Sequence, residues 1–243
     1  MYSIFKHLRT CAFVTLSCLS QQASAIYIDL NFSGTLSNSQ KTLFTQAEQF
    51  WETTLTGYQP SVNASLLSNI VINAEGTAID GVGGTLGSAG PTFGWTIGGY
   101  VLASEGDMRF DTADLNNLES NGSLESVILH EMAHVLGLGT LWEANGVYTS
   151  GSGQYTGANA LSLWQTEFGQ TSATYIPVEL GGGPGTAGGH WNEVNNGGAL
   201  TGITDTNNND LRYELMTGWL NSPTFISNMT IASFADIGYE VVY

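Results

Sequence analysis

The stretch from Ser123 to Gly137 constrains the fold most, because its pattern of apolar residues predicts a helix with one buried arc. Ser123 is expected to cap the N-terminus of this helix and Gly137 to close its C-terminus. Glu125 would lie in the first turn, where its negative charge complements the helix dipole. The residues expected on the buried arc are Leu124, Val127, Ile128, Val135 and Leu138.

Two histidines and a glutamate stand on this helix, in the order His130-Glu131-Met132-Ala133-His134. A helix turns about 100° per residue, so side chains four positions apart lie about 40° from each other on the same face. Two imidazoles placed in this way can bind a single Zn²⁺, with Glu131 beside the metal rather than bound to it. The competing interpretation is a pair of surface or capped histidines on an amphipathic helix, without a metal.

A single catalytic zinc needs a third protein ligand and one position left open for water. His190 is the remaining histidine after residue 25, and Gly188 and Gly189 before it would let the backbone approach the site closely. A glutamate, Glu167 or Glu179, is the alternative third ligand. The residues alone leave both kinds of ligand open.

The first 25 residues have the pattern of a signal peptide. Lys6 and Arg9 precede an apolar run from Cys11 to Leu19, and small residues at 23–25 form a cleavage site before Ile26. The apolar run is about half the roughly 20 residues that a membrane-spanning helix needs. We therefore expect a secreted protein, extracellular or periplasmic, with no transmembrane segment after the signal peptide is removed.

The charge of the chain excludes one large class of partners. The 243 residues contain 5 Lys+Arg and 21 Asp+Glu, which gives a formal net charge of −16. Without Lys6 and Arg9, three basic residues and all 21 acidic ones remain on residues 26–243, a formal charge of −18. Such a chain repels polyanions, so no nucleic-acid partner is expected.

Both cysteines also lie before residue 25, so the stability of the exported chain must come from core burial, a bound metal or both.

The remaining sequence predicts one continuous domain over residues 26–243. Alternating apolar residues at 26–32 predict a first strand, and further strands are expected around 69–73 and 101–110. Apolar residues at helical spacing predict a second long helix over 39–56, which Gly57 can end. The glycine-rich segment 81–99 lacks the spacing of a phosphate-binding loop and is interpreted as turns between short strands.

Three motifs together resemble the metzincin metalloproteases, and within them a bacterial-type member of the leishmanolysin-like peptidase family. They are His130-Glu131-x-x-His134-x-x-Gly137, the distant His190, and Glu214-Leu215-Met216-Thr217-Gly218. Thr140 stands where most metzincins have their third histidine. The leishmanolysin-like branch has an insertion at that point, which fits the 56 positions between His134 and His190. Segments 106–111 and 229–239 also look like parts of this family.

The resemblance implies an α+β fold, the two-lobed metzincin-type catalytic domain. Its N-terminal lobe, residues 26–138, would contain a twisted sheet and two long helices, and its C-terminal lobe, residues 139–243, would be less regular and would end in a helix over 229–237. The zinc would lie in the cleft between the lobes. The implied site consists of one catalytic Zn²⁺ on His130, His134 and His190, Glu131 as the catalytic residue, and Gly137 and Met216 as structural residues, the latter in a turn beneath the metal.

The expected function is that of a secreted zinc metalloendopeptidase. Water activated by Glu131 would attack peptide bonds of protein or peptide substrates. Two alternatives remain: a zinc-dependent hydrolase of a non-peptide bond, and a non-catalytic surface or adhesion protein that keeps the fold. An intact Glu131 and three intact histidines favour the enzyme over the non-catalytic protein.

Two further features give weaker evidence of a functional role. Residues 205–210 offer oxygen ligands of the kind calcium prefers, but they do not fit the EF-hand register, so a solvated turn is expected and no calcium is assigned. An aromatic group could line a pocket for apolar side chains or fill the core. Its members are Trp142, Tyr148, Tyr155, Trp164, Trp191 and Trp219.

Overall fold

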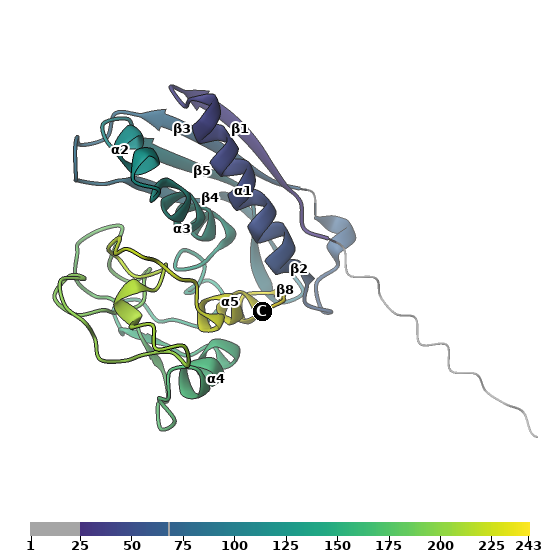
Figure 1. Cartoon of the computed structure of the whole chain (residues 1–243). Coiled ribbons are helices and arrows are strands. Elements are labelled where there is room, and N and C mark those ends of the chain that lie inside the picture. Colours follow the sequence, from purple (N-terminus) through teal and green to yellow (C-terminus); the bar gives the residue numbers. More distant parts are fainter. Residues whose placement is uncertain (1–24, 68) are drawn as a thin grey trace, which may run out of the picture.

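The computed structural model describes residues 25–67 and 69–243, and the predicted signal peptide lies outside them except for Ala25 (Figure 1). Helices and strands are mixed along this part of the chain, which confirms the α+β class. The elements are β1 (Ile28–Gly34), α1 (Asn38–Thr54), β2 (Leu55–Tyr58), η1 (Ala64–Leu66), β3 (Ile70–Thr77), β4 (Gly87–Ile97), β5 (Tyr100–Asp111), α2 (Leu115–Ser120), α3 (Leu124–Leu136), β6 (Gln154–Tyr155), α4 (Ala158–Thr166), β7 (Ile176–Pro177), η2 (Leu211–Tyr213), α5 (Asn228–Asp236) and β8 (Tyr239–Val241). Among these elements no helix combines the length and apolarity needed to span a bilayer.

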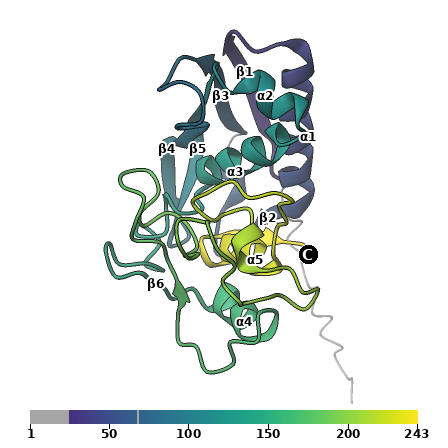
Figure 2. The same cartoon turned by 60° about the vertical axis from the view of Figure 1, so that its left-hand side comes forward.

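The main sheet has four strands in the order β1-β3-β5-β4. Strands β1, β3 and β5 are parallel, whereas β4 pairs antiparallel with β5 and forms one edge. One face carries a polar ladder, in which Asn31 donates to Asn73 over 3.4 Å and Asn73 donates to Asp107 over 3.0 Å. The other face is apolar, and Figures 1 and 2 show α1 and α3 side by side along the sheet. The sheet therefore follows the alternation expected for strands covered on one face.

Helix α1 begins and ends with clear local signals. The Ser37 hydroxyl accepts from the amide of Gln40 over 3.1 Å, and the Gln40 side chain accepts from the amide of Ser37 over 2.9 Å, which forms a capping box. The predicted end at Gly57 is wrong, because α1 stops at Thr54 and Gly57 lies in β2. Pairing of β2 with β8 takes the chain out of the helix earlier than the glycine signal indicated.

The interpretation of segment 81–99 as turns is also wrong for most of its length, because Gly87–Ile97 forms β4. An edge strand pairs on one side only, and most side chains of β4 are at least partly exposed, so it needs no apolar alternation. Its pairing shifts register around Phe93 and Gly94. A Cβ on Gly94 would lie 2.5 Å from the carbonyl oxygen of Leu102, so the glycine allows the two strands to approach there.

The chain after α3 is less regular, since long loops separate α4, α5 and short strands (Figure 2). Helix α5 confirms the helix expected near 229–237. It packs against α4 and reaches the first half of the chain, where the rings of Phe234 and Trp51 lie 5.1 Å apart. Strand β8 then pairs with β2, so one continuous hydrophobic core joins the two halves of the sequence.

Candidate metal centre

Helix α3 carries the two histidines of the motif, and its burial follows the predicted arc. Leu124, Val127, Ile128, Val135 and Leu138 are all buried. The polar side is enclosed as well, because the side chains of Glu131 and His134 are buried. His130 is partly buried, so the interpretation as surface histidines is wrong.

The ends of α3 agree with the sequence in part. Gly137 closes the helix in the left-handed conformation, with φ at 116°, and Glu125 lies in the first turn. The predicted cap at Ser123 is wrong, because its side chain accepts no hydrogen bond from the helix. Its backbone is already helical, and its amide donates to the side chain of Asn121 over 3.0 Å. Helix α2 thus leads into α3 through a tight turn that replaces a side-chain cap.

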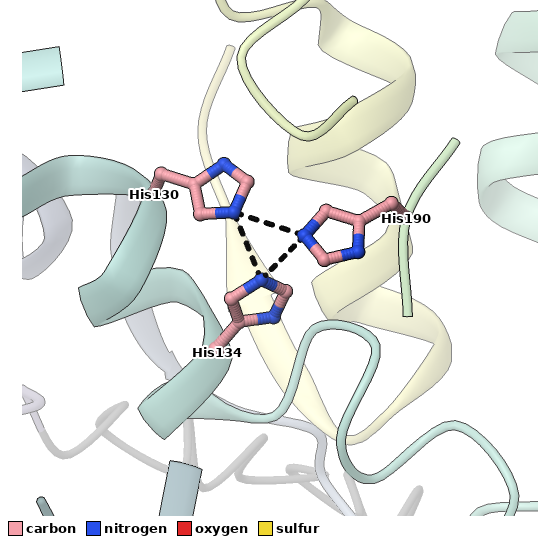
Figure 3. Close-up of side chains that lie close together, drawn as sticks. All are labelled: His130, His134 and His190. Atoms are coloured by element: carbon pink, nitrogen blue, oxygen red, sulfur yellow. Dashed lines mark hydrogen bonds between the residues drawn. The ribbon is translucent and has the colours of Figure 1, made fainter. Parts of the chain in front are cut away.

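His190 comes from a loop and completes the group (Figure 3). The Nε2 atoms of His130, His134 and His190 lie 3.0 Å from one another in all three pairs. A backbone contact brings the loop this close, because a Cβ on Gly139 would lie 2.2 Å from the carbonyl oxygen of Gly189. Gly139 adopts a positive φ of 75°. It is a site residue that the sequence reasoning missed, because its contact with Gly189 forms only in the folded chain and leaves no local signal.

The other ring nitrogens determine which atoms face the centre. Nδ1 of His130 lies 2.7 Å from the carbonyl oxygen of Leu215, and Nδ1 of His134 lies 2.8 Å from that of Leu138. Nδ1 of His190 lies 2.8 Å from the carbonyl oxygen of Thr186. A carbonyl oxygen only accepts, so each Nδ1 carries the proton and each neutral ring turns an unprotonated Nε2 toward the centre.

This arrangement fits a metal ion. Three unprotonated nitrogens cannot donate to one another, and a shared cation would compensate the repulsion between their lone pairs. The corners of such a triangle lie about 1.7 Å from its middle, which is within the usual Zn–N distance of about 2.0 Å, so one ion could reach all three nitrogens. Burial, and then the charge of His134, lower the pKa of His130 to about 3. Burial also lowers the pKa of His134 and of His190.

Glu131 lies beside this triangle and faces a cavity. Burial raises the pKa of its carboxyl group to about 8, and a cation on the histidines would lower that pKa again. Strand β4 passes directly opposite, since a Cβ on Gly87 would lie 2.9 Å from both Cγ and Oε1 of Glu131. The cavity has a volume of about 940 Å³ and lies between α3, β4, the loop that carries His190 and the segment 215–224.

The two alternative third ligands lie elsewhere. The Glu167 carboxylate accepts from the amides of Asn228 and Met229, over 3.0 and 2.8 Å, and so caps α5. Glu179 accepts from the amide of Gly181. Neither belongs to the group of potential metal ligands in the described part of the chain.

Met216 is fully buried next to the centre. Its carbonyl accepts from the amide of Trp191 over 3.0 Å, and its amide donates to Glu214 over 2.7 Å. The carbonyl that contacts a histidine belongs to the preceding residue, Leu215. The turn therefore meets the metal centre through its main chain.

The two less informative features have separate outcomes. Residues 205–210 form a turn as expected, but Asp205 and Asp210 are buried rather than solvated. Backbone amides donate to both carboxylates, so these residues need no cation. Most of the aromatic group is core, with Trp142 and Trp191 stacked 4.7 Å apart, whereas Tyr148 and Trp219 line the cavity.

No protein-family model matches this chain, and a search of curated proteins finds no similar sequence.

Proposed function

We propose that this protein is a secreted, zinc-dependent endopeptidase of the metzincin type, extracellular or periplasmic. The observation that carries the proposal is the triangle of Nε2 atoms, 3.0 Å on each side, with Glu131 next to it at the wall of a large cavity. In this proposal residues 26–138 and 139–243 act as two lobes with the catalytic site between them. No family model matches the chain, so the geometry of the site is the support for this proposal.

Zinc is the ion we assign, because three neutral imidazoles with an open fourth position are the donor set of catalytic zinc sites. Zinc held there would polarise a substrate carbonyl and lower the pKa of a water molecule toward about 7. The chain itself supplies the rigid ligands. Three main-chain carbonyls fix the rings, so little reorganisation is needed before an ion binds.

Glu131 would move the proton. In its ionised form the carboxylate accepts a proton from the attacking water, and it then delivers that proton to the amine that leaves. Enclosure by α3 and β4 keeps bulk water away from the carboxylate, which strengthens its interactions. One residue thus serves as base and then as acid.

A peptide is the substrate class that the cavity wall favours. Residues Gly87, Ser88 and Ala89 of β4 line the cavity, and β4 is an edge strand paired only with β5. Its free backbone groups can pair with an extended chain as an added strand. Such pairing recognises the peptide backbone and needs no chain terminus, which agrees with an endopeptidase.

The test is to measure zinc content and casein cleavage for residues 26–243, with and without a chelator. We expect zinc in the protein, cleavage that the chelator abolishes, and recovery when zinc is added. Glu131→Gln should keep the zinc and lose about 100-fold or more of the activity. Glu125→Gln, on the exposed face of the same helix, is the matched control and should cleave like the wild type.

Three outcomes would contradict the proposal. An active Glu131→Gln variant would remove Glu131 from the reaction. Chelator-sensitive hydrolysis of an ester substrate without casein cleavage would favour the non-peptide hydrolase. Bound zinc with no hydrolysis of either substrate would favour the non-catalytic protein.

A further inference from the structure

Glu193 is an unusual buried side chain outside the metal centre. The residue is 4% exposed, and both carboxylate oxygens are shielded from solvent without a hydrogen-bond partner among the described residues. An ionised carboxylate in such a place is unfavourable unless positive charge or several donors compensate it. A group of this kind therefore indicates either a bound proton or a cation.

A second buried carboxylate comes from the neighbouring segment. Val178 pairs with Trp191, and Trp191 pairs with Thr217 on its other side, so three segments lie next to one another. Glu179 follows Val178 directly and is 8% exposed. Glu193 lies two residues after Trp191, and the two acidic side chains thus come from adjacent segments of this group.

Their electrostatic coupling agrees with this placement. Burial raises the pKa of Glu193 to about 7, and the negative charge of Glu179 is the second contribution in the same direction. The amides of Glu193 itself and of Gly218 oppose this rise, but neither reaches hydrogen-bond geometry with the carboxylate. The two carboxylates are both buried on adjacent segments and therefore repel each other.

The cations of the chain do not compensate this charge. Lys41, Arg109 and Arg212 are the basic side chains within the described residues. Arg109 forms the one ion pair found there, with Glu75. Arg212 donates to Asn221 over 3.1 Å and lies over the ring of Tyr213. Lys41 lies over the ring of Phe32. None of the three basic side chains therefore pairs with Glu179 or Glu193, which leaves a bound proton or an external cation to balance the charge.

We propose that Glu179 and Glu193 bind a structural calcium ion. Carboxylate oxygens are hard ligands, and calcium completes its shell of 6–8 oxygens with backbone carbonyls and water. Two carboxylates form a weakly charged site, so the dissociation constant should be on the order of 10⁻⁴–10⁻³ M, as in extracellular modules. The ion would hold in place the two segments that contain Glu179 and Glu193. This would stabilise the position of His190, since the Glu179 amide donates to the His190 carbonyl over 2.9 Å.

The experiment measures calcium binding by the zinc-loaded protein, using titration calorimetry and thermal unfolding with CaCl₂. Wild type should bind one calcium per chain, and its Tm should rise by roughly 5–10 °C when calcium exceeds Kd about 100-fold. Glu193→Gln should abolish both effects and leave the zinc content unchanged. Glu105→Gln removes the same charge from an exposed position on β5 and should respond to calcium like the wild type.

Several results would overturn the calcium site. One is a wild-type protein that binds no calcium up to 10 mM, and another is a Glu193→Gln variant that binds it unchanged. If Glu193→Gln is more stable than a wild type that ignores calcium, Glu193 is buried in its protonated form instead. Should Glu193→Gln fail to fold, Glu179→Gln replaces it, and calcium affinity less than tenfold weaker than wild type would contradict the proposal.

Discussion

Each imidazole of the metal centre is oriented by a main-chain carbonyl, from Leu215, Leu138 or Thr186. Outer contacts of this kind fix the tautomer and raise the basicity of the donor nitrogen. Because the acceptors are backbone atoms, no single side-chain replacement removes them. The precision of the site depends instead on the loops that hold these carbonyls in place.

The third ligand can be tested by replacing His190 and Glu167 separately. His190→Ala should weaken zinc binding by more than the roughly 10–100-fold that an outer contact provides, because one of the three donor atoms is lost. Glu167→Ala should retain zinc but unfold more easily, by about 1 kcal/mol, since the amides at the start of α5 lose their acceptor. Metal analysis after dialysis and urea denaturation measure the two effects. Retention of zinc by His190→Ala together with its loss from Glu167→Ala would reverse the assignment.

Strand β4 and helix α3 approach each other at Gly87, where any side chain would meet Glu131. Gly87→Ala should therefore displace the carboxylate and lower kcat/KM for casein by about 100-fold, while the three histidines keep their zinc. Gly90→Ala is the control on the same strand, because its Cβ would meet only Thr140 Cγ2, at 3.8 Å. Cleavage kinetics and metal analysis of both variants provide the measurement. Equal activity of the two would show that the contact between Gly87 and Glu131 does not position the base.

The elements that the sequence predicted well are those whose burial leaves a periodic pattern. Helices α1 and α3 each bury one face, and the buried face of α1 includes Phe44, Ala47 and Trp51. Strand β4 buries little, so its residues show no alternation and the glycines suggested turns. The pairing of β2 with β8 joins residues about 180 positions apart, and no local signal could show that it ends α1 at Thr54.

In the metal site, too, local spacing predicts some residues, whereas others depend on contacts between distant parts of the chain. His130 and His134 could be paired from spacing alone, because one helix sets their separation. His190 could be nominated as the remaining histidine, but its approach depends on the contact between Gly139 and Gly189, which only the folded chain brings together. The unpartnered carboxylate of Glu193 could not be foreseen at all. Nothing in the sequence distinguishes it from an exposed glutamate.

At the scale of the whole molecule, a metal would join two distant parts of the chain. His130 and His134 belong to α3, whereas His190 belongs to the loops that follow it. An ion that binds only the folded state stabilises it by RT ln(1 + [Zn]/Kd). Because the chain has no cysteine after residue 25, this linkage would supply the kind of stabilisation that disulfides give to many secreted proteins.

The pH dependence of stability gives a test of the buried base in the metal-free protein. The folded-state pKa of Glu131 is about 8, compared with an ordinary value of 4.5. Between these values the folded chain holds a proton that the unfolded chain has released, so Glu131 makes the protein less stable as pH rises from 4.5 to 8. Glu131→Gln lacks this dependence. Metal-free Glu131→Gln should therefore gain stability over wild type with rising pH, by at most about 1.4 kcal/mol per unit, and level off above pH 8.

Urea denaturation of both metal-free proteins at several pH values measures this difference. Added zinc should reduce it, because a cation beside Glu131 stabilises the ionised carboxylate and offsets the effect of burial on its pKa. A difference that stays constant from pH 4.5 to 8 would mean that Glu131 is ionised in the folded, metal-free protein. The carboxylate would then be as well solvated as in the unfolded chain, and the enclosure by α3 and β4 would not account for its chemistry.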